Sequence, residues 1–246
     1  MLNEYIANKK TVLITGGSRG IGACAVRAYA DKGYNVAFTY LKSKDKADIL
    51  ERECDALAIC ADMSDSSQVD MAIKLTIEHF GKIDVLVNNA GVDEFTLFTD
   101  ITDEMWDKML RNNLSSAFYA SRGVVKQMIS NQNGVIINIS SMWGQVGASC
   151  EVHYSVSKAG LIGLTKALAK ELGPSNIRVN CICPGVIDTE MNSRLSIDDI
   201  EQLKYDTPLG KIGSCEDVVS TMLFLSENSS SFITGQILGV NGGYII

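Results

Sequence analysis

The feature that most limits the fold of this chain is the regular alternation of short apolar runs with longer amphipathic stretches. Seven runs have the length of strands, and several are apolar throughout, as strands buried on both faces are. They cover residues 11–15, 35–40, 56–60, 83–87, 134–139, 177–183 and 236–240. Helical patterns lie between them, for example at 65–80, 103–130 and 154–172. The alternation predicts a doubly wound α/β fold, with a mainly parallel seven-stranded sheet and helices on both of its faces.

Length and composition are typical of one globular domain, and we expect residues 1–246 to form it. The net charge of −7, without any basic stripe, excludes nucleic acid as a partner. No apolar run reaches the ~18–20 residues that span a bilayer, and residues 1–10 have no signal-peptide pattern, which indicates a cytoplasmic protein. The seven cysteines form no Cys-x-x-Cys pair, so we expect free thiols and no metal site.

A glycine-rich segment follows the first predicted strand and begins the first helical stretch. It reads Thr15-Gly16-Gly17-Ser18-Arg19-Gly20-Ile21-Gly22. Glycines permit a tight turn and the close approach of a pyrophosphate, whose charge the helix N-terminus attracts. The spacing differs from the common Gly-x-Gly-x-x-Gly fingerprint, and a plain structural turn is the alternative. The position after a strand favours a dinucleotide site made by Gly16, Ser18, Arg19, Gly20, Ile21 and Gly22.

The end of the second predicted strand indicates which nicotinamide cofactor is used. NAD sites place an acid there for the ribose hydroxyls. This chain has Tyr40, Lys42 and Ser43 instead, with no carboxylate before Asp45. Together with Arg19, Lys42 suits a 2′-phosphate. We therefore expect NADP(H) rather than NAD(H), the alternative being that Lys42 is a solvated loop lysine.

Two more strand ends carry polar or small residues. Asp62, with Met63 beside it, is placed to accept a hydrogen bond from the adenine amino group, or else to cap the helix at 65–80. The fourth strand ends in Asn88-Asn89-Ala90-Gly91. Small residues there let the backbone approach the cofactor ribose, and asparagine amides tie strands together. We assign Asn89, Ala90 and Gly91 to the cofactor site and treat Asn88 as mainly structural.

Tyr154 and Lys158 are four residues apart at the start of a long helical stretch, so they share one helix face. A nearby lysine cation lowers the pKa of a phenol from its usual value of about 10, which permits proton transfer to a carbonyl oxygen. Ser141, just past the fifth strand, is placed to stabilise charge on that oxygen, with Ser140 as its rival. Asn113 is placed either to anchor a water near Lys158 or to kink its helix.

These motifs together resemble the short-chain dehydrogenase/reductase family, whose fold is Rossmann-like. The matches are the glycine-rich turn, Asn88 to Gly91, Asn113, Ser141, Tyr154, Lys158 and Pro184-Gly185. The resemblance implies a catalytic tetrad of Asn113, Ser141, Tyr154 and Lys158. It also implies contacts of Ile187 and Thr189 with the nicotinamide amide and places Pro184 and Gly185 in the cofactor site. We assign Tyr154 and Lys158 to the cofactor site as well, with Lys158 holding the nicotinamide ribose. The resemblance further implies a substrate lid within about residues 188–210 and a homotetramer.

Within this family the chain most resembles 3-oxoacyl-[acyl carrier protein] (β-ketoacyl-) reductases of fatty acid biosynthesis, on residues 160–169 and 233–243. Their basic carrier-binding positions correspond here to Gln132 and Ser175, which are not cationic. Acidic residues flank the expected site instead, and the candidate substrate contacts are Asp93, Glu94, Trp143 and Glu151. An acidic rim repels an acidic carrier and attracts a cationic substrate.

Residues 147–152 resemble a relative that fits such a substrate, the reductases of 5-aminopentanone-modified elongation factor P. Glu151 would pair with the ammonium group, or it simply stabilises a helix N-terminus. We rank NADPH-dependent reduction of the acyl carrier protein thioester first, and keep elongation factor P or another small ketone as alternatives. A silent nucleotide sensor would be expected to lack Tyr154 or Lys158, and a scaffold protein leaves the glycine-rich turn unexplained.

Overall fold

The computed structural model describes residues 9–192 and 196–246, and its centre is one seven-stranded sheet. The strands are β1 (Thr11–Ile14), β2 (Asn35–Tyr40), β3 (Leu57–Cys60), β4 (Val85–Asn88), β5 (Gly134–Ile139), β6 (Ile177–Pro184) and β7 (Ile237–Val240). Their order is β3-β2-β1-β4-β5-β6-β7, and every neighbouring pair is parallel. The predicted strands are confirmed, each end lying within about two residues of the prediction.

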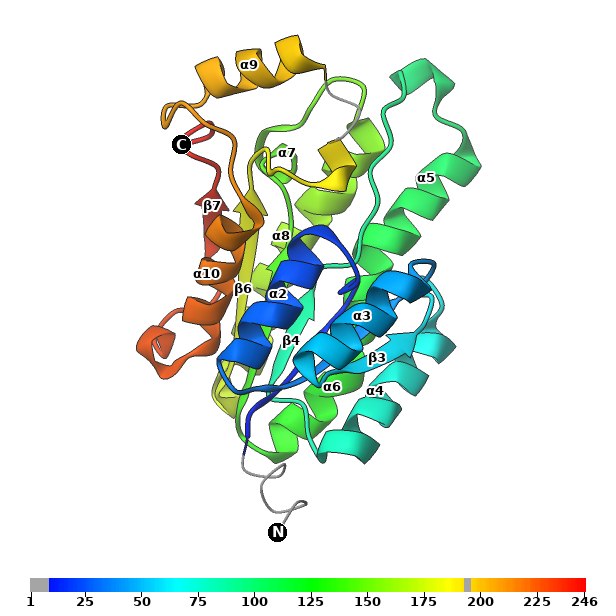
Figure 1. Cartoon of the computed structure of the whole chain (residues 1–246), viewed down its shortest axis with the longest axis vertical. Coiled ribbons are helices and arrows are strands. Elements are labelled where there is room, and N and C mark those ends of the chain that lie inside the picture. The colour runs from blue at the N-terminus through cyan, green and yellow to red at the C-terminus, as the bar shows by residue number, and fades with distance from the viewer. Residues whose placement is uncertain (1–8, 193–195) are drawn as a thin grey trace.

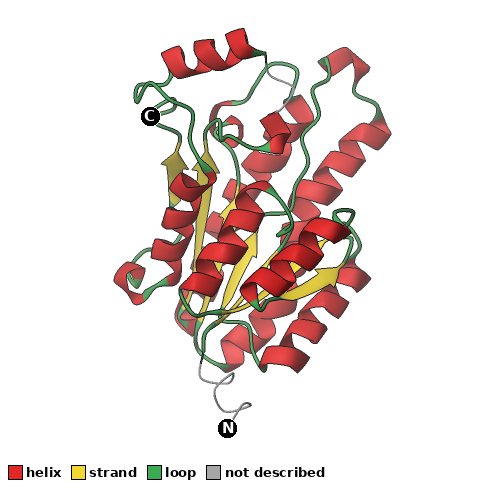
Figure 2. Ribbon diagram, viewed as in Figure 1, coloured by secondary structure: helices red, strands yellow, loops and turns green. Residues whose placement is uncertain are grey.

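Helices cover both faces of this sheet (Figures 1 and 2). They are α2 (Gly20–Asp31), α3 (Lys44–Cys54), α4 (Ser66–Phe80), α5 (Asp103–Leu110), α6 (Ser116–Ser130), α7 (Trp143–Val146), α8 (Val152–Leu172), α9 (Ile197–Asp206) and α10 (Cys215–Ser226). One core cluster joins the sheet to α2, α3 and α10, and a second joins it to α4, α6 and α8. The doubly wound arrangement is therefore confirmed.

Strand β1 illustrates why the buried strands are apolar throughout. Val12 and Ile14 belong to one core cluster, whereas Leu13, between them, belongs to the other. Successive side chains of a strand point to opposite faces, and here both faces are covered. Cys181 and Cys183, two residues apart in β6, share one face of the sheet and are both fully buried. All seven cysteines are free thiols.

The predicted helix over 103–130 is wrong in one respect, because it is interrupted. Helix α5 ends at Leu110, a π-helical turn occupies Arg111–Ser115, and α6 continues from Ser116. The two asparagines in this turn are weak helix formers, and Asn112 donates a side-chain hydrogen bond to the Lys108 carbonyl (2.8 Å). The wider π turn points the Asn113 side chain inward, where it is buried.

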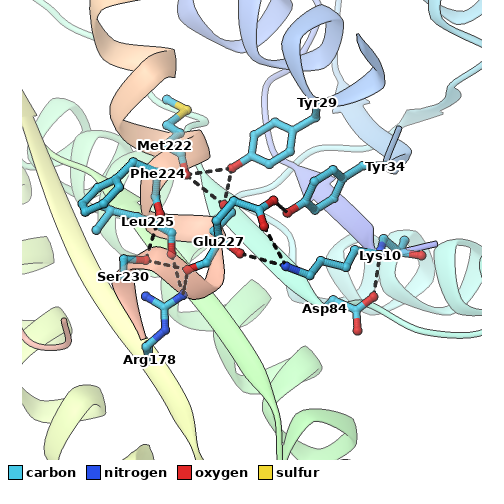
Figure 3. Close-up of polar contacts among 12 residues, drawn as sticks. Lys10, Tyr29, Tyr34, Asp84, Arg178, Met222, Phe224, Leu225, Glu227 and Ser230 are labelled. Carbon is cyan, nitrogen blue, oxygen red and sulfur yellow. Dashed lines mark hydrogen bonds and ion pairs between the residues drawn. The ribbon is translucent and has the colours of Figure 1, made fainter. Parts of the chain in front are cut away.

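A network of polar contacts closes the amino edge of the sheet, opposite the strand ends that carry the motifs (Figure 3). Glu227, just after α10, accepts hydrogen bonds from the Tyr34 hydroxyl (2.6 Å) and the Lys10 ammonium (3.3 Å). The Arg178 guanidinium donates to the carbonyls of Leu225 (2.6 Å) and Glu227 (3.4 Å). These bonds connect the starts of β1, β2 and β6 to the end of α10.

No helix in the described ranges has both the length and the apolarity that a bilayer crossing requires.

Candidate active site

The glycine-rich turn between β1 and α2 depends on the absence of side chains. Gly16 and Gly20 have φ of +66° and +52°, which other residues rarely adopt. A Cβ on Gly17 would lie 2.5 Å from the Phe38 side chain, and one on Gly22 would lie 2.2 Å from the Gly16 carbonyl oxygen. The turn therefore keeps its backbone close to its neighbours and leads directly into the N-terminus of α2. Such a terminus attracts the phosphates of a dinucleotide.

The end of β4 is tied to this turn. The Asn89 side chain donates to the carbonyls of Thr15 (3.1 Å) and Gly16 (3.0 Å), and the Thr15 hydroxyl accepts from the backbone N–H of Ala90 (2.9 Å). Asn88 donates to the Asn138 side chain (2.8 Å), which links β4 to β5 and confirms the structural role predicted for it. Together these bonds align the carboxyl ends of the three central strands.

A cavity of about 150 Å³ opens at the carboxyl edge of the sheet. The predicted site residues that line it are Ile21, Asn89, Gly91, Asp93, Ser141, Trp143, Glu151, Tyr154, Lys158, Pro184, Gly185, Ile187 and Thr189. Three members of the predicted tetrad, Ser141, Tyr154 and Lys158, thus face one space. Outside this lining lie the other predicted residues of the glycine-rich turn, those at the ends of β2 and β3, and Ala90, Glu94 and Asn113.

Lys158 is the buried charge of the site. Its ammonium donates to the Ile139 carbonyl (2.9 Å) and lies 5.7 Å from the centroid of the Tyr154 ring. Burial lowers the pKa of Lys158 to about 8, against an opposing effect of the Cys181 and Cys183 thiols and the Asp93 carboxylate. A lysine with this pKa is still mainly cationic at neutral pH, so it can stabilise a phenolate on Tyr154.

The two candidate serines have different partners. The Ser140 hydroxyl donates to the Lys158 carbonyl (2.7 Å) and is buried. The Ser141 oxygen accepts from the backbone N–H of Trp143 (3.1 Å), which leaves its proton for an acceptor in the cavity. Ser140 therefore fixes α8 against β5, and Ser141 is the better candidate for binding a substrate oxygen.

Asn113 lies one layer behind the cavity. Its amide nitrogen donates to the Val92 carbonyl (2.8 Å) and the Ser157 hydroxyl (3.0 Å), and its oxygen accepts from the Val92 N–H (2.8 Å). A Cβ on Gly91 would lie 3.2 Å from the Asn113 oxygen and 3.3 Å from the Lys158 nitrogen. The Asn113 oxygen and the Lys158 nitrogen thus lie on either side of Gly91. This arrangement is compatible with both roles predicted for Asn113, anchoring a water near Lys158 and kinking its helix.

Asp62 is not the cap of the following helix, so that alternative is wrong. Its carboxylate accepts from the backbone N–H (2.9 Å) and the hydroxyl (2.7 Å) of Ser64. Asp65 caps α4 by accepting from the Ser67 N–H (2.9 Å). The helix cap is thus three residues later than this alternative expected, because residues 62–65 form a turn before α4 begins. Met63 is buried beside it.

The cations predicted for the cofactor, Arg19 and Lys42, are both exposed near the glycine-rich turn. A third cation, Lys46 in the first turn of α3, lies in the same region and was not singled out from the sequence. It forms an ion pair with Glu190, which is next to Thr189. A Cβ on Gly20 would lie 3.6 Å from the Thr189 side chain, so this segment lies across the glycine-rich turn. The lysine-rich sequence 42–46 was the available signal.

The predicted lid, residues 188–210, includes the short helix η4 (Glu190–Asn192) and α9. Residues 193–195 of this prediction lie outside the described residues. Asn192 lines the cavity and donates to the Ile187 carbonyl (2.7 Å), so the start of the segment is anchored at the site. Of the acidic candidates, Asp93 and Glu151 are brought together at the cavity, both half-buried.

Comparisons with known proteins agree with this geometry. A family profile described as enoyl-(acyl carrier protein) reductase matches residues 16–245. The 3-oxoacyl-[acyl-carrier-protein] reductase FabG of Staphylococcus aureus is 39% identical over 239 residues, which cover 95% of this chain and 97% of that protein. The FabG of Thermotoga maritima is 38% identical over 242 residues, covering 96% and 98%. The structure of a short-chain dehydrogenase/reductase double mutant from Serratia marcescens superposes with a TM-score of 0.91 at 36% identity, covering 97% and 98%.

Proposed function

The chain belongs to the short-chain dehydrogenase/reductase family, and from that premise we propose that it reduces a 3-oxoacyl thioester on acyl carrier protein with NADPH. The observation that carries the proposal is the convergence of Ser141, Tyr154 and Lys158 on one cavity beside the glycine-rich turn. The relatives named 3-oxoacyl-[acyl-carrier-protein] reductase, which match almost end to end, support the choice of substrate.

In this proposal the side chains of the cavity protonate the substrate oxygen and stabilise the negative charge that develops on it. The nicotinamide supplies a hydride to the carbonyl carbon when it is bound. Tyr154 donates its phenol proton to the carbonyl oxygen as negative charge develops there. Ser141 donates a hydrogen bond to the same oxygen. Lys158, buried and cationic below pH 8 or so, stabilises the phenolate that Tyr154 becomes.

We propose NADPH over NADH because the end of β2 carries no carboxylate and three cations, one of them paired with Glu190, lie near the glycine-rich turn. Arg19 and Lys42 are exposed there, and Lys46 reaches across to Glu190. Tyr40, at the end of β2, offers no carboxylate to the ribose hydroxyls. Guanidinium and ammonium groups bind a 2′-phosphate through charge-assisted hydrogen bonds.

A second candidate substrate is a ketone that carries an ammonium group, such as 5-aminopentanone-modified elongation factor P. The observation that favours it is that two carboxylates, Asp93 and Glu151, line the catalytic cavity. A negative rim attracts a cation and disfavours the acidic surface of an acyl carrier. The two candidates share the chemistry at Tyr154 and differ only in what holds the rest of the substrate.

One experiment separates them: NADPH oxidation with an acetoacetyl thioester on carrier protein, a small β-ketoester, and a ketone with a primary amine. We expect the highest kcat/KM with the carrier-bound thioester. A preference for the amino ketone that is lost in Glu151→Gln would assign the second candidate instead. Absence of turnover with all three ketones would contradict the reductase proposal.

We further propose that the enzyme is a cytoplasmic homotetramer. Its free thiols suit a reducing compartment. The long helices α6 and α8 present the apolar side chains Phe118 and Val156 to solvent, exposed by 44% and 42%. A tetramer built on these two helices would remove both side chains from water. Light scattering coupled to size-exclusion chromatography tests the assembly, and a monomer at micromolar concentration would contradict it.

A further inference from the structure

The residues after β7 form a tight turn with a fixed shape. Gly242 and Gly243 have φ of +64° and +86°. The Asn241 side chain closes the turn, since its oxygen accepts from the Gly243 N–H (3.0 Å) and its nitrogen donates to the Ile245 carbonyl (3.0 Å). The Tyr244 N–H donates to the Asn241 carbonyl (3.1 Å). The turn therefore holds Tyr244 in one direction.

This C-terminal turn, residues 241–246, is also fixed to the segment that follows α9, beside which the chain ends in Figure 1. The Leu209 N–H donates to the Gly242 carbonyl (3.1 Å). A Cβ on Gly242 would lie 2.6 Å from the Thr207 side chain, and one on Gly243 would lie 3.1 Å from Pro208. The turn and residues 207–209 thus pack as closely as glycine allows.

Tyr244 extends from this turn to the wall of the catalytic cavity. Its ring meets the Trp143 ring edge to face, with centroids 5.9 Å apart and planes at 87°. Trp143 lines the cavity, and its backbone N–H binds the Ser141 oxygen. The contact with Tyr244 is made by the indole, whereas the bond to Ser141 is made by the backbone. The two ends of Trp143 are therefore held separately.

Trp143 is two residues from Ser141, the proposed partner of the substrate oxygen, and its side chain is the largest of those that line the cavity. A substrate whose carbonyl oxygen reaches Ser141 therefore passes close to the indole. We propose that Tyr244 is a positioning residue that holds the Trp143 indole against the substrate, and thereby sets the KM for the ketone. This inference rests on the proposed reductase function.

The test compares Tyr244→Ala with Tyr244→Phe, which keeps the ring. Loss of an edge-to-face aromatic contact is expected to raise the KM for a small β-ketoester about 2- to 12-fold in Tyr244→Ala. The kcat should stay within about twofold, because Ser141, Tyr154 and Lys158 are untouched. Binding of NADPH, followed by its fluorescence, should be unchanged. Tyr244→Phe should behave as the unmodified enzyme.

A second readout does not require turnover. Replacing Trp106 by Phe leaves Trp143 as the only tryptophan, whose quenching by acrylamide reports how firmly the indole is held. We expect quenching to increase in Tyr244→Ala and to return to its original level in Tyr244→Phe. The control is Phe232→Ala, which removes a fully exposed aromatic ring after α10 and should change neither quenching nor KM.

An unchanged KM in Tyr244→Ala would overturn the inference, whether or not quenching increases. So would equal effects of Tyr244→Ala and Tyr244→Phe. If the unmodified enzyme reduces no ketone, the proposed function fails. In that case unchanged quenching in Tyr244→Ala would show separately that Tyr244 does not hold the indole.

Discussion

The two edges of the sheet contrast in how completely their polar groups are satisfied. At the amino edge, Glu227 accepts hydrogen bonds from Tyr34 and Lys10, and Arg178 donates to the Leu225 carbonyl. The buried Tyr29 hydroxyl pairs with Ser226 (2.6 Å). At the carboxyl edge, the glycine-rich turn offers no side chains for such bonds, and the buried Lys158 lines a cavity.

The buried side-chain polar atoms without a partner, among the residues that the structure describes, all lie at the carboxyl edge. They are the oxygen of Asn88 and both ring nitrogens of His153. An unpaired buried polar atom costs stability. The comparison indicates that the amino edge, where the polar groups are paired, contributes more to stability than the carboxyl edge, where these three buried atoms have no partner.

The sharpest test of this division is Tyr154→Phe, which removes one proton donor from the carboxyl edge. We expect kcat/KM for a small β-ketoester to fall about 10²- to 10⁴-fold, since general acid catalysis is lost. NADPH affinity and the melting temperature should be retained. Tyr34→Phe, which removes a hydroxyl at the amino edge instead, is the control for turnover. Normal turnover in Tyr154→Phe would exclude it as the proton donor.

The matching change at the opposite edge is Arg178→Leu. It removes the donor to the carbonyls of Leu225 and Glu227, and hydrogen bonds to a charged group contribute about 1.5–3 kcal/mol. We expect the free energy of unfolding, measured with urea, to fall by about that amount. The kcat per folded molecule should stay constant. A loss of activity without a loss of stability would refute the division between the two edges.

At the carboxyl edge, His153 offers a substitution that should increase stability rather than decrease it. It is fully buried next to Tyr154, and replacing an unsatisfied polar group by an apolar one of similar size removes a desolvation cost. We expect His153→Leu to raise the free energy of unfolding by about 1 kcal/mol. A decrease in that free energy, seen in urea titrations, would mean that His153 has a partner in solution.

The cation Lys46 belongs to the carboxyl edge but lies on its rim, so its effect should be smaller. For Lys46→Ala we expect the NADPH dissociation constant to rise about two- to fivefold, with that of NADH unchanged. Lys42→Asp should act in the same direction. Lys74→Ala, which breaks an exposed ion pair with Glu78 on α4, is the control. Equal weakening of both cofactors would argue against a 2′-phosphate site here.

The smallest effect concerns pH at the amino edge. The Tyr34 hydroxyl and the Lys10 ammonium hold the pKa of Glu227 below its usual range, against burial, which raises it. A carboxylate with a lowered folded-state pKa stabilises the protein above its unfolded pKa of about 4.3, and this contribution is lost as pH falls through the folded value. Because Glu227 is 47% exposed, we expect less than about 1 kcal/mol.

Urea titrations between pH 3 and 7, compared with Tyr34→Phe, measure this contribution. The variant should lose part of the difference in stability between the two ends of this range. An identical pH dependence would show that the hydroxyl does not hold the carboxylate charged.

The sequence predicted the sheet because each buried strand has neighbours on both faces and is therefore apolar along its whole length. It also predicted the set of Ser141, Tyr154 and Lys158, since each follows a strand or shares a helix face. The π turn at Arg111–Ser115 was missed because it changes the backbone hydrogen bonds without breaking the apolar pattern of residues 103–130. The contacts of Lys46 with Glu190, and of Trp143 with Tyr244, join residues far apart along the chain. Local patterns do not report such contacts.

Burial of Lys158 also affects the chemical reactivity of the protein. With a pKa of about 8, this amine is neutral in about one molecule in ten at pH 7, whereas an ordinary lysine, of pKa about 10.4, is neutral in fewer than about one in a thousand. Only the neutral amine is a nucleophile. A small aldehyde or acylating reagent that enters the cavity should therefore modify Lys158 ahead of the exposed lysines, and a bound dinucleotide should shield it.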